Sequence, residues 1–73
     1  GAILGAMREN GGLVELQAIG AGAVNQAVKA IAVTRRIAEQ EDGSCKIKVV
    51  PGFVDMKLRE KPITAIKLTV FAG

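Results

Sequence analysis

Several residue types that carry chemistry in proteins are absent or rare in this chain. It has no histidine, tyrosine or tryptophan, and it has one cysteine, two prolines and two phenylalanines in 73 residues. General acid–base catalysis uses histidine most often, and the seven acidic residues are scattered rather than grouped in a motif. The single thiol, Cys45, has no second cysteine for a disulfide and no histidine to complete a metal site. The composition therefore argues against an enzyme, a metal-binding protein and a disulfide-stabilised secreted domain.

The chain also lacks a long hydrophobic run. No apolar stretch approaches the roughly 20 residues that a membrane-spanning helix needs, although 49% of the residues are hydrophobic. A chain of this length forms one domain and buries only about 60% of the surface that its unfolded form exposes. We therefore expect a single domain over residues 1–73, in the cytoplasm, with no membrane contact, cofactor or small-molecule substrate.

Apolar periodicity in the first half of the chain predicts a helix, a strand and a second helix. Apolar residues at helical spacing over 3–7, with no N-cap residue before them, indicate a chain that begins inside a helix and leaves it at residues 10–12. Alternating residues predict a strand over 13–19, and a helix follows over 23–39. The apolar stripe of that helix is predicted to consist of Val24, Ala27, Val28, Ile31 and Ala32.

The second half predicts extended segments. An alternating strand over 46–50 is expected to be interrupted at Pro51, and extended patterning resumes over 53–58. Residues 59–62 are typical of a hairpin tip, and the return strand spans 63–71.

The return strand has one apolar and one polar face. Ile66, Leu68 and Val70 share the first, while Lys67 and Thr69 share the second, so the sheet should be buried on one side and wet on the other. A strand, a helix and a further strand in succession favour a crossover that places both helices over the same face of a mixed sheet. The predicted fold class is a two-layer α/β (α+β) sandwich.

Positive charge is concentrated in the second half. Residues 1–45 carry four basic and five acidic side chains, whereas residues 46–73 carry six basic and two acidic ones, a net of plus four. Lys57, Arg59 and Lys61 alternate with other residues near the predicted hairpin tip, so we expect them to point to one side and to bind phosphates together. Three further lysines should widen this basic surface: Lys46, Lys48 and Lys67.

The basic residues are also compatible with a purely structural role. Lysines on a strand keep a sheet edge or a wet sheet face from aggregating, and a net charge of +3 is modest for a nucleic-acid-binding protein. The aromatic surface on which proteins stack unpaired bases is missing, since only Phe53 and Phe71 are available and Phe71 is expected in the core. The acidic residues Glu39, Glu41 and Asp42 are expected to be solvated.

A glycine turn precedes the second predicted helix. Gly20 and Gly22 permit a sharp reversal of the chain. The backbone N–H groups of this turn and the amide of Asn25 could meet a phosphate at the positive end of the helix dipole. The segment lacks the P-loop lysine and the spacing of the dinucleotide fingerprint. The glycines are needed for the turn whether or not an anion binds, so a purely structural role stays open.

Residues 17–31, QAIGAGAVNQAVKAI, resemble the stage V sporulation protein S family, small bacterial proteins with a fold like that of the nucleic-acid-binding protein Alba. AILGAMRENGG is similar to the end of that family's first helix, PGFVD at 51–55 to its proline-and-aromatic segment, and TAIKL at 64–68 to its closing strand. The family's first strand has no counterpart in this sequence. The resemblance therefore implies a domain truncated at its N-terminus, with either a preceding segment or a strand edge open to association.

The resemblance also implies a function. Alba-type proteins are understood to bind nucleic acid through their extended hairpin and the turn before the second helix, and the family is associated with regulating sporulation and development in bacteria. It implies a non-enzymatic, homodimeric protein that binds DNA or RNA phosphates. The residues expected to contact nucleic acid are Lys57, Arg59, Lys61, Lys46, Lys48, Lys67, Gly20, Gly22 and Asn25. The alternative is a protein-interaction or assembly module that binds no nucleic acid.

Overall fold

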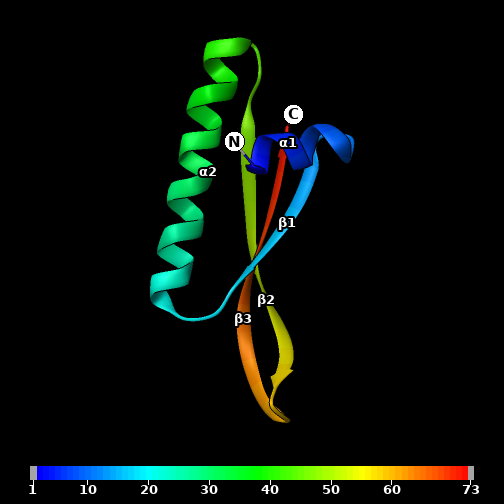
Figure 1. Ribbon diagram of the computed structural model, residues 1–73, viewed down its shortest axis with the longest axis vertical. Coiled ribbons are helices and arrows are strands. Elements are labelled where there is room, and N and C mark those ends of the chain that lie inside the picture. Colours follow the sequence, from blue (N-terminus) through cyan, green and yellow to red (C-terminus); the bar gives the residue numbers. More distant parts are fainter. Residues whose placement is uncertain (1, 73) are drawn as a thin grey trace.

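The computed structural model describes residues 2–72 and has two helices and three strands. Their order is α1 (Ala2–Glu9), β1 (Leu13–Ala18), α2 (Ala21–Glu41), β2 (Ile47–Leu58) and β3 (Lys61–Ala72), as Figure 1 shows. The predicted order of helix, strand, helix, strand, strand is confirmed, and the fold is α+β. Neither helix of the described chain has the length and apolarity that crossing a membrane requires.

The three strands form one sheet in the order β1-β3-β2. β3 lies in the middle and pairs antiparallel with both neighbours, from Leu13↔Phe71 on one side and from Ile47↔Ala72 on the other. Within residues 2–72 the sheet is therefore antiparallel at both pairings, and the predicted mixed sheet is wrong for this part of the chain. β1 and β2 nevertheless run in the same direction, because both are antiparallel to β3. α2 is therefore a crossover between two parallel strands that are separated by β3.

β2 continues through Pro51 without a break, which corrects the predicted interruption. Pro51 has no N–H group and is excluded from central strands because it cannot donate to the ladder. β2 is an edge strand with a single neighbour, β3. In an edge strand, the backbone nitrogen of a residue can point to the free margin of the sheet, where no neighbouring strand needs an N–H donor. The edge position of β2 therefore explains why the proline is tolerated.

Both helices pack on one face of the sheet, which we call the helix-bearing face. Met7 from α1 and Ile31 from α2 join Leu68 and Val70 of β3 in a single core. Met7 is 2% exposed and Val70 is fully buried, at 0%. The opposite side is the open face. The predicted two-layer arrangement with one buried sheet face is thereby confirmed.

The buried stripe of α2 differs from the predicted one. Val28 is 51% exposed and Ala32 is also exposed, whereas Thr34 and Ala38 are buried. Thr34 is polar, but its hydroxyl donates to the carbonyl oxygen of Ala30 one turn earlier, at 2.8 Å. Because this hydrogen bond satisfies the hydroxyl within the helix, the side chain can occupy a core position.

The β2–β3 ladder extends well past the third strand. β1 ends with the pair Ala18↔Ile66, while β2 and β3 continue to pair as far as Leu58↔Lys61. We call residues 54–65 the hairpin arm; it projects beyond α2 and β1 in Figure 1. On the open face of the arm, the cross-strand pairs Val54↔Ala65 and Met56↔Ile63 place apolar side chains against each other. These pairs hold together a two-stranded ribbon that no helix covers.

The arm ends in a two-residue turn made by Arg59 and Glu60. Both residues have positive φ, 51° and 66° respectively. This backbone conformation is the one that two-residue hairpin turns require, and Asn-Gly sequences adopt it most readily. Two charged residues with long side chains occupy it instead, although the left-handed region disfavours any residue that carries a Cβ atom.

Candidate nucleic-acid interface

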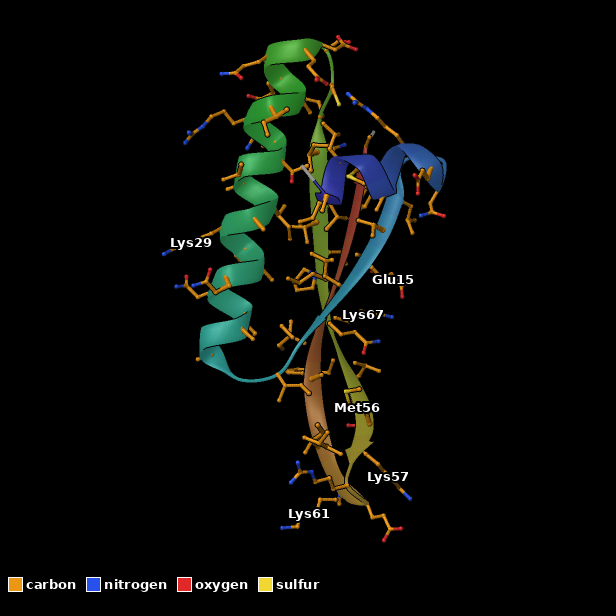
Figure 2. All side chains as sticks on the ribbon, viewed as in Figure 1. Glu15, Lys29, Met56, Lys57, Lys61 and Lys67 are labelled. Carbon is orange, nitrogen blue, oxygen red and sulfur yellow. The ribbon has the colours of Figure 1, made fainter. Side chains whose placement is uncertain are left out.

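The three cations of the hairpin arm do not share one side, which corrects the sequence-based expectation. Lys57 pairs with Pro62 and Lys61 pairs with Leu58. Partners in an antiparallel ladder share a face and successive residues alternate, so Lys57 lies on the helix-bearing face and Lys61 on the open face. Figure 2 shows the two side chains diverging from the end of the arm. Arg59 lies in the turn between them.

The turn explains this outcome. Along one uninterrupted strand, residues 57, 59 and 61 would alternate onto a single face. The chain instead reverses within two residues, and the position opposite Lys57 becomes Pro62. The arm therefore presents a cation on each face and a third at its tip.

A second group of predicted residues does share a face. Lys48 and Lys67 lie on the open face of the sheet, opposite Phe71 and Gly52. Lys61, opposite Leu58, has the same place in the alternation, but the ribbon twists toward its tip, and Figure 2 shows Lys61 and Lys67 pointing to opposite sides. Lys67 and Lys61 are six positions apart on β3, which corresponds to about 20 Å at the rise of a strand. Lys46 is exposed in the loop that precedes β2. The lysines of the sheet and of the arm tip are therefore widely spaced and face different directions.

The open face also carries other groups. Glu15 lies there, opposite Thr69, and Figure 2 shows it on the same side of the sheet as Lys67. Phe71 lies there too, opposite Leu13, and is partly exposed. The prediction that Phe71 belongs to the core is therefore wrong, because its strand position places it away from the helices.

None of the six cations in residues 46–72 forms an ion pair with the described part of the chain. The ion pairs found within residues 2–72 are Arg8 with Glu41, between the ends of the two helices, and Arg35 with Glu39, one turn apart on α2. In the arm, Asp55 accepts a hydrogen bond from the hydroxyl of Thr64 at 3.3 Å rather than meeting a cation. The lysine and arginine side chains of the arm are exposed and available to an external anion.

The acidic residues at the end of α2 and just after it, one partly exposed and two exposed, each have a hydrogen-bonding partner. Glu39 and Glu41 form the two ion pairs just described. The carboxylate of Asp42 accepts from the hydroxyl of Ser44 at 2.7 Å and from its backbone N–H at 3.0 Å. These two hydrogen bonds, the hydroxyl first, lower the pKa of Asp42 below its ordinary value of 3.8. The acidic cluster therefore shapes the loop that leads into β2.

The turn before α2 lies near the root of the hairpin arm. Gly20 caps α2 with φ 87°, a conformation that favours glycine, and no side chain among residues 2–72 caps the free N–H groups of the first turn. Gly20 and Asn25 line a shallow groove of about 530 Å³ together with Thr64 and Ile66 of β3. Gly22 faces open space, since a Cβ atom placed there meets nothing within 4 Å. The groove thus joins two predicted regions, the start of α2 and the arm.

Sequence reasoning missed the exposure of Phe53. Its side chain is 78% exposed, the most of any large hydrophobic residue in the described chain. Phe53 lies on the helix-bearing face of the edge strand β2 and pairs with Ile66, which lines the groove. The sequence feature that could have indicated this exposure is the preceding pair Pro51 and Gly52. Proline is confined to edge strands, where few neighbouring elements cover a side chain.

The fold is a small α+β arrangement in which three cations without an ion-pair partner in residues 2–72 lie on an exposed ribbon. A family model supplies a closer assignment. The model of stage V sporulation protein S (SpoVS) matches residues 1–73, the whole chain. The chain belongs to this family, and the resemblance first seen in residues 17–31 is confirmed.

Proposed function

We propose that this protein is a non-enzymatic regulator that binds DNA or RNA through the hairpin arm. The observation that carries the proposal is that Lys57, Arg59 and Lys61 stand on a ribbon free of helices and have no ion-pair partner within residues 2–72. Binding to phosphates relies on such cations, and its strength follows the number of phosphates neutralised. Membership of the stage V sporulation protein S family supports a role in regulation.

Because the cations diverge, we favour a binding mode in which the arm inserts between phosphates over one in which a single face of the arm contacts them. Lys57 and Lys61 reach phosphates on opposite faces of the ribbon, and Arg59 reaches a third at the tip. Lys67, Lys48 and Lys46 extend the contact along the sheet. Gly20, Gly22 and Asn25 add backbone and amide donors at the start of α2, near the root of the arm. These contacts are independent of base sequence, so binding is weakly specific and sensitive to salt.

A salt titration of labelled duplex DNA and RNA tests the proposal. Affinity should fall steeply with added salt, because each phosphate contact contributes about 0.9 to the slope of log affinity against log salt for duplex DNA. Reversing the arm's charge with Lys57→Glu, Arg59→Glu and Lys61→Glu should flatten the slope and weaken binding. The matched control reverses the same number of charges on α2: Lys29→Glu, Arg35→Glu and Arg36→Glu.

The control separates arm contacts from overall charge. Lys29 points away from the sheet in Figure 2, and Arg35 and Arg36 lie in the second half of α2, beyond the α2 residues that line the groove at the root of the arm. Because both variants change the net charge equally, equal losses of affinity would contradict the assignment to the arm. Absence of binding to any nucleic acid at low salt would reject the function altogether.

A second candidate, a protein-interaction or assembly module, is favoured by the apolar residues exposed on β2. Val49 is 40% exposed on the helix-bearing face, and Val50 is 54% exposed on the open face. The outer edge of β1 also has no partner strand among the residues described. We propose that a second copy of the chain covers part of this surface, giving a homodimer under either candidate function, so the salt titration above, and not dimerisation, distinguishes the two candidates. Sedimentation equilibrium tests this, and a monomer at all concentrations would contradict it.

A further inference from the structure

We propose that the groove at the root of the hairpin arm, with Phe53 beside it, is a binding site for an unpaired nucleotide. The inference rests on the proposed function and makes it more specific. It states that single-stranded or locally unpaired nucleic acid is preferred over a continuous duplex. The base stacks on Phe53, and the rest of the nucleotide occupies the groove.

The first observation is the position of Phe53. A phenylalanine that is 78% exposed leaves most of its apolar surface in contact with water, which is unfavourable unless a partner covers it. It lies at the base of an arm whose three cations have no ion-pair partner within residues 2–72. Proteins that hold single strands combine exposed aromatic rings with basic side chains that follow the backbone, because every base has a π-face that can stack.

The second observation is the size of the groove. An apolar cavity of about 150 Å³ holds one benzene molecule, so each non-hydrogen atom needs about 25 Å³. At that ratio, the 530 Å³ of the groove accommodates roughly twenty non-hydrogen atoms. This is the size of one nucleotide.

The third observation is the chemistry of the lining. Val24, Val28 and Ile66 supply apolar surface, and Asn25 and Thr64 supply polar groups. No hydrogen bond within residues 2–72 engages the amide of Asn25, whereas the hydroxyl of Thr64 bonds to Asp55. A largely apolar wall with a few polar groups is typical of sites for nucleosides and other small ligands. The Asn25 amide both donates and accepts, so it can bond to the edge of a base.

The geometry links these parts. Phe53 is the ladder partner of Ile66, and Ile66 pairs on its other side with Ala18, which also lines the groove. The ring therefore stands next to the groove on the same face of the sheet. A base within a duplex is stacked between its neighbours and cannot place its face on Phe53, so the site accepts an unpaired base.

A direct test uses the absence of tryptophan from the chain. Phe53→Trp introduces a single indole at the proposed site, and Val33→Trp introduces one at a residue of α2 that is 50% exposed outside the groove lining. A short oligothymidylate should quench the emission of the Phe53→Trp protein and leave that of the Val33→Trp protein nearly unchanged. A duplex of equal length should quench neither through stacking.

Affinity measurements give a second readout. Phe53→Leu keeps an apolar side chain without the ring, and the residue is too exposed for the change to unfold the protein. Loss of one stacked base corresponds to about a 5- to 150-fold weaker affinity for oligothymidylate. Affinity for the duplex should stay within about twofold, since the arm's phosphate contacts remain.

The outcomes separate this inference from the function on which it rests. If the unmodified protein binds neither single strands nor duplexes at low salt, the proposed function fails and the nucleotide site with it. If it binds, but Phe53→Leu binds oligothymidylate equally well and the indole at position 53 is not quenched, the nucleotide site alone is rejected. A change in that indole's emission with protein concentration, without nucleic acid, would assign Phe53 to contact with a second copy and would overturn the inference.

Discussion

Thr64 and Asp55 face each other across the hairpin arm, where the threonine hydroxyl donates to the carboxylate at 3.3 Å. Asp55 is thereby held on the same face of the ribbon as Lys57, two residues further along β2. The carboxylate places a negative charge beside a cation that is proposed to bind phosphate. Its removal should strengthen binding.

Asp55→Asn tests this relationship. The amide oxygen still accepts the bond from Thr64, while the repulsion of phosphate disappears, so affinity for nucleic acid at low salt should rise about two- to fivefold. Electrophoretic mobility or fluorescence anisotropy measures the change. The gain should vanish at high salt; unchanged or weaker binding at low salt would show that Asp55 lies away from the phosphates.

The turn at the tip predicts a gain in stability. Glu60 has φ 66°, and glycine adopts this conformation without the clash of a Cβ atom. Glu60→Gly should therefore stabilise the protein by about 1 kcal/mol in urea unfolding. Glu60→Ala removes the same charge but keeps the Cβ atom, and equal stabilisation by both variants would assign the effect to charge.

The core predicts a large loss. Met7 is 2% exposed between α1 and the sheet, so Met7→Ala should cost about 2–5 kcal/mol. A domain of 73 residues has a total stability of roughly 4–11 kcal/mol, so the variant should unfold at much lower urea concentration. Leu58→Ala, at a residue 55% exposed near the tip, is the control and should change stability by less than about 0.5 kcal/mol.

The loop after α2 predicts a dependence on pH. Because hydrogen bonds from Ser44 lower the pKa of Asp42 in the folded protein, the ionised carboxylate stabilises the fold above its ordinary pKa of 3.8. This contribution is lost as the pH falls from that value through the lowered pKa. Ser44→Ala should be less stable than the unmodified protein near neutral pH, and the difference should shrink in acid. A difference that persists unchanged in acid would contradict the role of the carboxylate.

Local sequence patterns predict the order of the elements and which face of β3 is buried. The alternation of Ile66, Leu68 and Val70 is a property of one strand, and it holds in the structure. The fate of Pro51 is different, because a proline is tolerated or excluded according to the place of its strand in the sheet. That place follows from contacts between distant segments, which no single window of sequence contains.

The same limit applies to the candidate site. The face on which Lys57 and Lys61 lie depends on which residues oppose each other after the turn, and therefore on the number of turn residues. Neither Arg59 nor Glu60 carries the glycine signal that marks a two-residue turn. In α2, hydrophobicity alone selects Val28 for the core and leaves Thr34 outside it. The structure shows the reverse, because the hydrogen bond to Ala30 offsets the cost of burying the threonine hydroxyl.

The proline in β2 has an effect beyond the strand that contains it. An incoming strand needs a regular row of N–H donors, and Pro51 leaves a gap in that row at the free margin of the sheet. Enlargement of the sheet is thus hindered on the β2 side. Within the part of the molecule that the structure describes, any additional strand, whether from another chain or from a longer form of this one, is directed to the flank of β1.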